Sequence, residues 1–275
     1  MSKFTDQQYL KTDQYRDSTN LEARVVIHQR FSTNSYGWFK WVFDTLAKLP
    51  GNARILELGC GHALLWKENV NRIPAEWNIT LSDLSSGMLD AAWRNLVVTG
   101  RAFKFEEIDA QSIPYGNETF DAVVANHMLY HVPDRPKAIA EVHRVLKPGG
   151  RLIATTIGYG HLKELNDWLR RASGGKAVEP MPISFTLENG AEQLSACFSQ
   201  LDILRYRDSL HVTEIEPLIA FFHASFFSTE IMPEALLEIR DELETELKEK
   251  GRILISKDSG LFEAIKQRSN HGLER

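Results

Sequence analysis

The sequence predicts an α/β fold built on a doubly wound, mostly parallel sheet. The first observation is that strand-like and helix-like runs alternate from residue 52 to 157, which is the pattern of a sheet with helices on both faces. The second is the apolar strand Arg54–Leu58, which breaks into the glycine turn Gly59-Cys60-Gly61 and then into a helix. Glycine tolerates positive φ and has no Cβ, so this turn lets the backbone approach a ligand beside a helix N-terminus.

Each element of the alternating region has its own signal. The strands are short apolar runs, whereas the helices have apolar residues at three- and four-residue spacing and stop at proline or glycine. We therefore expect strands at residues 54–58, 78–83, 103–108, 120–125 and 151–157, and helices at residues 63–72, 86–98 and 134–146.

The flanking regions are predicted to be mainly helical. We expect helices at residues 21–31, 38–49, 161–171, 185–198 and 234–250, and one that opens with a capping box at residues 213–216. Strands are expected at residues 201–210, 252–256 and 261–266, the last two forming a closing hairpin. Residues 1–50 are then an N-terminal helical segment covering the site, residues 51–160 the ligand-binding core, and residues 161–275 a helical lid plus closing strands of the same domain.

The composition excludes several classes of protein. The chain of 275 residues is 43% hydrophobic and 25% charged, which is ordinary for a globular protein. Its net charge is −5 and it has no long basic run, so we expect no nucleic-acid partner. We also expect no membrane span and no signal peptide, because no apolar run is long enough and residues 1–20 are polar. The two cysteines suggest no disulfide framework and favour a cytoplasmic location.

Three carboxylates follow three successive strands of the predicted sheet. Glu57 lies two residues before Gly59 of the glycine turn, Asp83 ends the second strand, and Asp109 follows the third. Parallel strands present their carboxyl ends at one edge of a sheet, so these acids are expected to face one ligand. A dinucleotide site would need a third glycine where Leu64 stands. The pattern therefore favours a ligand with a ribose, an adenine amine and an ammonium group, without a phosphate.

Five motifs, in order, resemble those of class I S-adenosylmethionine-dependent methyltransferases of the small-molecule type, similar to the ubiquinone-biosynthesis methyltransferases. The motifs are Leu56-Glu57-Leu58-Gly59-Cys60-Gly61, Ser82-Asp83-Leu84-Ser85-Ser86-Gly87-Met88-Leu89, Asp109-Ala110, the run 120–127, and Leu146-Lys147-Pro148-Gly149-Gly150-Arg151-Leu152. The resemblance is strong over residues 50–157 and loose elsewhere. It implies a Rossmann-like seven-stranded sheet, mostly parallel with an antiparallel last strand, and a helical cap. It also implies S-adenosylmethionine as the cofactor and a small-molecule acceptor methylated on O, N or C.

The resemblance further implies which residues bind the cofactor. Glu57 is expected to hold the methionine ammonium, Asp83 the ribose, and Asp109 the adenine amine. The other expected cofactor contacts are Gly59, Cys60, Gly61, Leu84, Met88, Ala110, Asn126 and His127. Cys60 is expected to be a small turn residue and not a reactive thiol.

The acceptor side is less specified. Tyr15 and His28 of the N-terminal segment and Phe222 of an aromatic stripe are expected to contact the acceptor, although such a stripe more commonly forms plain core. His131 is the candidate general base, which O- or C-methylation needs and N-methylation can do without. His127 and His131 stand four residues apart, but no third ligand is visible, so we expect no metal.

Two other functions stay open at this point. An NAD-dependent oxidoreductase is weakened by Leu64 and by the extra acid Asp109. A non-catalytic binding module would keep the fold to serve a partner. Neither the acceptor nor the oligomeric state follows from the sequence.

Overall fold

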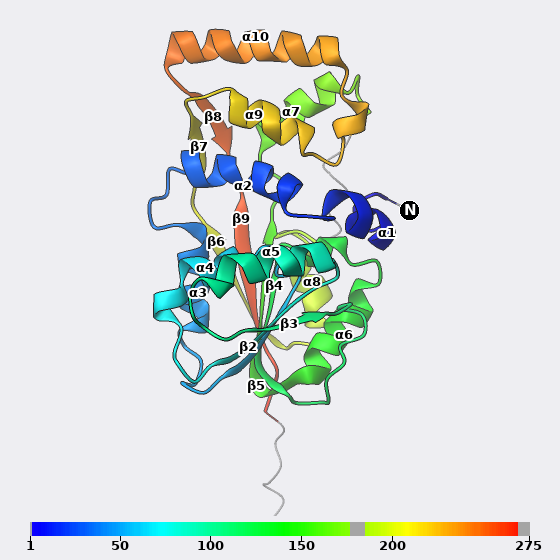
Figure 1. Ribbon diagram of the computed structural model, residues 1–275. Coiled ribbons are helices and arrows are strands. Elements are labelled where there is room, and N and C mark those ends of the chain that lie inside the picture. The colour runs from blue at the N-terminus through cyan, green and yellow to red at the C-terminus, as the bar shows by residue number, and fades with distance from the viewer. Residues whose placement is uncertain (1, 177–184, 269–275) are drawn as a thin grey trace, which may run out of the picture.

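The computed structural model describes residues 2–176 and 185–268, and it contains the expected seven-stranded sheet (Figure 1). In the order of the sheet, the strands are β3 (Lys104–Glu107), β2 (Asn78–Asp83), β1 (Arg54–Leu58), β4 (Phe120–Asn126), β5 (Leu146–Ile157), β9 (Ser259–Ile265) and β6 (Gln200–Tyr206). The first five strands pair in parallel, whereas β9 runs antiparallel to both of its neighbours. The predicted fold class is therefore confirmed, including the antiparallel last strand.

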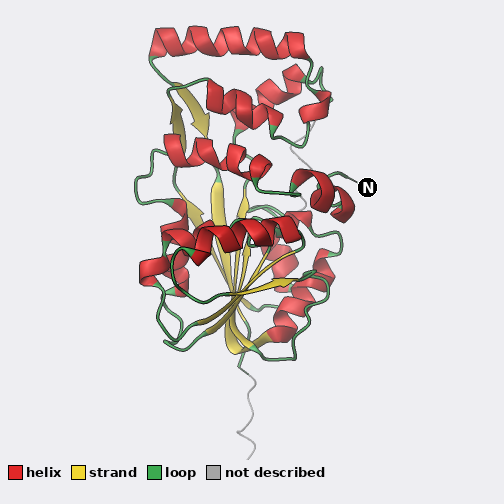
Figure 2. Cartoon of the chain, viewed as in Figure 1, coloured by secondary structure: helices red, strands yellow, loops and turns green. Residues whose placement is uncertain are grey.

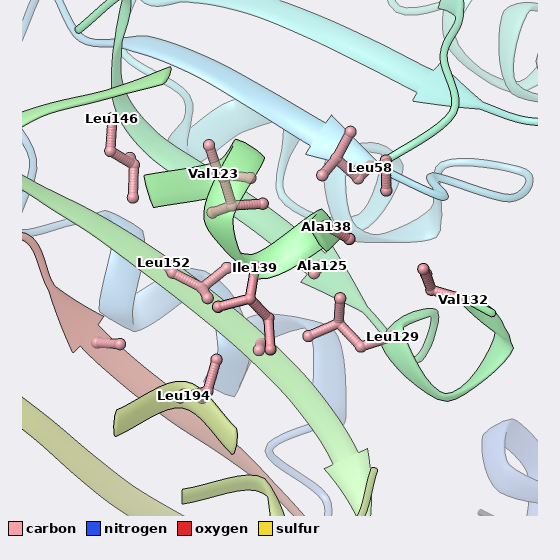
Figure 3. Packing of buried hydrophobic residues seen from close by; sticks show 14 of the residues in the cluster. Leu58, Val123, Ala125, Leu129, Val132, Ala138, Ile139, Leu146, Leu152 and Leu194 are labelled. Atoms are coloured by element: carbon pink, nitrogen blue, oxygen red, sulfur yellow. The ribbon is translucent and has the colours of Figure 1, made fainter. Parts of the chain in front are cut away.

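Helices cover both faces of the sheet (Figure 2). One face packs against α3 (Trp38–Leu46), α4 (Leu64–Glu68) and α5 (Ser86–Val97), and the other against α6 (Arg135–Val145) and α8 (Gly190–Ser195). Strand side chains alternate between the faces. Leu56 and Leu58 of β1 therefore join the α6 side, where Val123, Leu152 and Ile139 are fully buried (Figure 3), and Ile55 joins the α4 side. Glu57 shares the face of Ile55, so its side chain meets α4.

A cap lies beyond the carboxyl ends of the parallel strands (Figure 1). It comprises α7 (Lys163–Ala172), the two-stranded sheet of β7 (Ser209–Val212) and β8 (Ile253–Ser256), α9 (Glu216–His223) and α10 (Pro233–Lys250). The cap has its own apolar core, which includes Leu165, Leu218, Phe222, Ile239 and Leu243. The helix α2 (Thr19–Phe31) lies between the cap and the main sheet and contributes Ile27 and Phe31 to the cap core.

The predicted closing hairpin is wrong. β8 pairs with β7 in the cap, and β9 enters the main sheet between β5 and β6. The expected strand 201–210 is accordingly split, because the chain leaves β6 at Tyr206 and starts β7 at Ser209. The buried side chains of β9 explain the choice, since they need a neighbour on either side, whereas those of β8 alternate between buried and exposed.

Three smaller expectations are corrected by local chemistry. The expected helix 185–198 begins only at Gly190, because the side chain of Asn189 accepts a hydrogen bond from the Thr186 N–H and holds a turn. The expected capping box is absent, since α9 starts at Glu216 with Pro217 in its first turn and no side-chain cap. Residues 147–150, expected as a turn, lie within β5, where the pairing with β4 shifts register.

Phe262 is a strong test of this core, because it lies on the interior strand β9 and its fully buried ring packs against Phe185. We expect Phe262→Ala to lower the free energy of unfolding by about 3 to 5 kcal/mol, through lost burial and a residual cavity. Ile203 pairs with Phe262 across the strands but is 47% exposed, so Ile203→Ala should cost about 1 kcal/mol. Urea unfolding of both variants checks the prediction, and equal losses would contradict the packing described.

Candidate functional site

One cavity of about 730 Å³ opens at the carboxyl ends of β1, β2 and β4, under α2 and the N-terminal residues. A volume of this size accommodates a nucleoside-sized ligand together with a second small molecule. Nearly all the sequence-predicted site residues line it, namely Tyr15, His28, Glu57, Gly59, Cys60, Gly61, Asp83, Leu84, Met88, Asp109, Ala110, Asn126, His127 and His131. Phe222 does not line the cavity. It is fully buried in the cap core, and its neighbour Phe221 reaches the cavity instead.

The glycine turn has the backbone that the sequence required. Gly59 and Gly61 have φ angles of +63° and +54°, a region that favours glycine. A Cβ on Gly59 would lie 2.7 Å from the Cβ of Met128, so a side chain there would also displace the segment after β4. The Cys60 N–H donates to the carbonyl of Ser82, which ties the turn to the end of β2.

Glu57 is a buried carboxyl group with neutral partners. Its Oε2 accepts a hydrogen bond of 2.5 Å from the indole N–H of Trp66, and its Oε1 accepts one of 3.3 Å from the Asn126 amide. Thr155 in turn donates to the Asn126 Oδ1, which fixes the orientation of that amide. Desolvation raises the pKa of Glu57 to about 8, because these hydrogen bonds offset only part of the cost of burying its charge.

Asp83 links the ends of β1 and β2. Its Oδ2 accepts a hydrogen bond from the Gly61 N–H at 3.0 Å, and its Oδ1 accepts one from the Ser85 N–H at 2.9 Å. Burial raises the pKa of Asp83, and the backbone donors oppose that rise. Each oxygen still has a lone pair for a ligand hydroxyl.

Asp109 is held by two glutamines. Gln111 donates to both carboxylate oxygens through its side chain and to Oδ1 through its backbone, and Gln7 donates to Oδ2 at 3.1 Å. Burial raises the pKa of Asp109, but these hydrogen bonds outweigh it and leave the pKa below its ordinary value. Gln7 belongs to the short helix α1 (Gln7–Tyr9), so the N-terminal residues reach the far end of the cavity.

Tyr15, Arg24 and His131 form a hydrogen-bonded chain. The His131 Nδ1 lies 2.8 Å from the carbonyl oxygen of Phe4 and therefore carries the proton of the neutral ring. The other nitrogen, Nε2, can then accept from the Tyr15 hydroxyl at 3.0 Å, and Arg24 donates to that hydroxyl at 3.1 Å. Burial, aided by the charge of Arg24, lowers the pKa of His131 to about 4, so its Nε2 is an unprotonated acceptor at neutral pH.

His127 is an imidazole that packs against aromatic rings. It has a φ of 49° just after β4, and its ring lies against Trp38 and Tyr130. Burial, together with the charge of Lys257, lowers the pKa of His127 to about 4. Across residues 2–176 and 185–268 no group of three metal-ligating side chains is placed to hold an ion.

Several site residues had no signal in the sequence. Trp66 meets Glu57 across nine residues, Gln7 meets Asp109 across 102, and His161 and Lys257 reach the cavity from the cap side. Only tertiary packing brings these side chains to the site. Arg24 lies within residues 1–50, which were predicted to cover the site, but its contact with Tyr15 had no signal in the sequence.

The raised pKa of Glu57 predicts a distinct dependence of stability on pH. The folded state holds the Glu57 proton up to about pH 8, whereas an unfolded chain releases it near pH 4.5. Stability is therefore lost as the pH rises through this window. Glu57→Gln mimics the protonated side chain at every pH. The free energy of unfolding of this variant, relative to that of the wild type, should therefore rise by roughly 3 to 5 kcal/mol between pH 4.5 and pH 8. Urea unfolding of both proteins at several pH values measures this difference in free energy. The histidines titrate in both proteins, so their contributions cancel. A difference that does not change with pH would contradict the raised pKa of Glu57.

Sheet order, glycine turn and strand-end acids together define the class I methyltransferase fold. Residues 56–154 match the family model described as "Methyltransferase domain". A ubiquinone/menaquinone biosynthesis C-methyltransferase from Coxiella burnetii is 29% identical over 130 residues, which is 46% of this chain and 52% of that protein. Its counterpart from Desulfotalea psychrophila is 33% identical over 116 residues, 42% of this chain and 46% of that protein. The chain thus spans about half the length of the curated relatives it matches.

Solved structures share the fold at low identity. A phosphoethanolamine N-methyltransferase 2 from Haemonchus contortus in complex with S-adenosyl-L-methionine superposes with a TM-score of 0.60 at 18% identity, covering 98% of this chain and 61% of that one. A 4+2-cyclase superposes with a TM-score of 0.58 at 21% identity, covering 96% and 97%. Since one neighbour is a cyclase, the fold by itself does not fix the reaction.

No helix of the described ranges is long and apolar enough to cross a membrane.

Proposed function

We propose that the chain is an S-adenosylmethionine-dependent methyltransferase that acts on O, N or C of a small molecule. The choice of cofactor rests on one observation. Three acids in one cavity have no ion-pair partner within 4 Å among the described residues, namely Glu57, Asp83 and Asp109. Their hydrogen-bond donors are backbone N–H groups and neutral side chains. Such a set suits a ligand that brings an ammonium group, two ribose hydroxyls and an adenine amine, and the matched relatives and a cofactor-bound neighbour support the same ligand.

In this proposal, the residues bind the parts of the cofactor that the sequence analysis assigns to them. Glu57 would hold the ammonium, with Asn126 keeping its orientation, Asp83 would accept both ribose hydroxyls, and Asp109 would accept the adenine amine. Leu84, Met88 and Ala110 would supply apolar contacts to ribose and adenine. When bound, S-adenosylmethionine supplies an electrophilic methyl group on a sulfonium.

The protein must also position the acceptor and exclude water. These two effects contribute much of the rate of such a displacement. The N-terminal residues contribute directly to that cover. Ser85 donates to the carbonyl of Tyr15 at 2.6 Å, and a Cβ on Gly87 would lie 1.9 Å from the carbonyl oxygen of Arg16. The covering segment therefore lies directly on the first turn of α5. We propose residues 1–50 as this cover, residues 51–160 as the cofactor-binding core, and residues 161–275 as lid and closing strands, of which 177–184 and 269–275 lie outside the described residues.

His131 is proposed as the general base, acting with Tyr15. The Nε2 of His131 is unprotonated and accepts from the Tyr15 hydroxyl, so a proton from the acceptor can pass to Nε2 directly or through that hydroxyl.

A cytoplasmic location and a reaction without nucleic acid also belong to this proposal. They rest on the free cysteines Cys60 and Cys197 and on the acidic net charge.

Two measurements test the proposed function. Isothermal calorimetry with S-adenosylhomocysteine should show one binding site, whereas NADH should give no heat of binding. Incubation with methyl-labelled S-adenosylmethionine and a panel of small acceptors should then transfer label with stoichiometric release of S-adenosylhomocysteine. Binding of NADH in place of S-adenosylhomocysteine would support an oxidoreductase instead, and binding without transfer to any acceptor would support a non-catalytic module.

A further inference from the structure

The cavity has an acidic end and a basic end. Glu57, Asp83 and Asp109 gather at the strand ends, whereas Arg24 and His28 of α2 and His161 after β5 line the part that faces the cap. Arg24 and His28 are four residues apart and therefore share one face of α2. The acidic end is assigned to the cationic cofactor, so the basic end is left for the acceptor.

Arg24 has no carboxylate partner in the part of the chain that the structure describes. Its Nε donates to the carbonyl of Asn20 at 3.3 Å and its Nη2 to the Tyr15 hydroxyl at 3.1 Å, both neutral oxygens. Among the described residues no carboxylate oxygen lies within 4 Å of its guanidinium. An arginine that lines a cavity in this state has donors and charge available for an anion.

His28 and His161 add hydrogen-bonding nitrogens beside it. The Nδ1 of His28 is buried and has no hydrogen-bond partner within residues 2–176 and 185–268, which is costly unless a ligand or water supplies one. The two rings stack with centroids 5.8 Å apart. His161 Nδ1 accepts from the Asp258 N–H at 3.2 Å, so the neutral ring carries its proton on Nε2 as a donor.

The acids nearest to this end are already neutralised. Asp208 pairs with Lys257 at 2.5 Å, and both side chains are almost fully buried. Glu68, the fourth acid that lines the cavity, lies near Lys40 and takes a hydrogen bond from Gln29. Burial lowers the pKa of His28, and the charges of Lys257 and Arg24 lower it further.

We propose that the acceptor carries an anionic group, a phosphate or a carboxylate, which binds between Arg24, His28 and His161 at the end of the cavity opposite the three acids. This inference rests on the proposed function, because that function makes the basic end the acceptor compartment. The opposed charges would orient two ligands at once, with the cationic cofactor at one end and the anion of the acceptor at the other. The acceptor atom would then lie between them, beside Tyr15 and His131.

The test uses the full chain saturated with S-adenosylhomocysteine and two probes, inorganic phosphate and acetate. In an NMR titration, the imidazole signals of His28 and His161, assigned through His28→Gln and His161→Gln, should shift saturably, whereas those of His211 and His223 should not. Arg24→Gln should raise the dissociation constant of the anion at least tenfold. Arg30→Gln, on the same helix but paired with Glu214, should change it less than twofold. If Arg24→Gln does not fold, His28→Gln serves as the weakened variant.

Each outcome decides one point. Tighter binding of phosphate indicates a phosphorylated acceptor, and tighter binding of acetate indicates a carboxylate. The absence of a saturable shift with both probes, or equal affinities in the wild type and Arg24→Gln, overturns the proposal. Failure of S-adenosylhomocysteine to bind overturns the proposed function, while saturable anion binding at His28 and His161 would still establish the anion site.

Discussion

Replacing Asp83 by asparagine is expected to raise the dissociation constant of S-adenosylhomocysteine about 100-fold. The carboxylate would accept both ribose hydroxyls, and hydrogen bonds to a charged, desolvated group contribute about 1.5 to 3 kcal/mol each. An amide has one acceptor oxygen, and its NH₂ group faces a backbone donor, either Gly61 or Ser85. Loss of about 2.7 kcal/mol corresponds to the expected factor of 100.

Asp90 offers the matched control for this experiment. It is an exposed acid on the same helix, α5, that begins beside Asp83. Asp90→Asn changes the net charge by the same amount and should leave the calorimetric dissociation constant within twofold. Equal affinities of Asp83→Asn and the wild type would remove Asp83 from the cofactor site.

Replacing His131 by glutamine is expected to lower kcat for methyl transfer at least 100-fold, the usual contribution of a general base. Tyr15→Phe should lower kcat by a similar factor, because it removes the hydroxyl that contacts His131 Nε2. The binding of S-adenosylhomocysteine should stay within twofold in both variants, since neither residue is assigned to the cofactor. The double variant should lose little more than either single one, because the two residues act as a unit.

The pH profile separates a chemical role of His131 from a structural one. The wild-type kcat should fall only as the pH approaches about 4, where His131 becomes protonated. His131→Gln should lack this acid limb in the pH range where the protein remains folded. Unchanged kcat in both single variants would show that the acceptor reacts without this base, as N-methylation allows.

The glycines and acids that are assigned to the cofactor could be located in the sequence because their signals are local. Glycines that need positive φ, and an acid at the end of a strand, are read from a few neighbouring residues. Parallel pairing then places Glu57 and Asp83 at the same edge of the sheet, since β1 and β2 are neighbouring strands. The alternation of strand and helix likewise predicts the parallel sheet.

The acceptor half depends on contacts between distant residues. Tyr15 meets His131 across 116 residues, and His161 meets Ser259 across 98. The same limit explains two of the predictions that were wrong, the closing hairpin and the position of Phe222. The strands β8 and β9 are adjacent in the sequence and therefore resemble a hairpin, but each pairs with a strand that is distant in the sequence. Phe222 faces the cap core because α9 packs against α2.

A crystal structure with S-adenosylhomocysteine tests the assignment of the three carboxylates most directly. The predicted result is a ligand in the cavity with Asp83 bonded to its ribose hydroxyls, Asp109 to its adenine amine and Glu57 to its ammonium group. Its sulfur should face the compartment lined by Tyr15 and His131. A ligand bound elsewhere, or one that leaves these carboxylates without contact, would contradict the assignment.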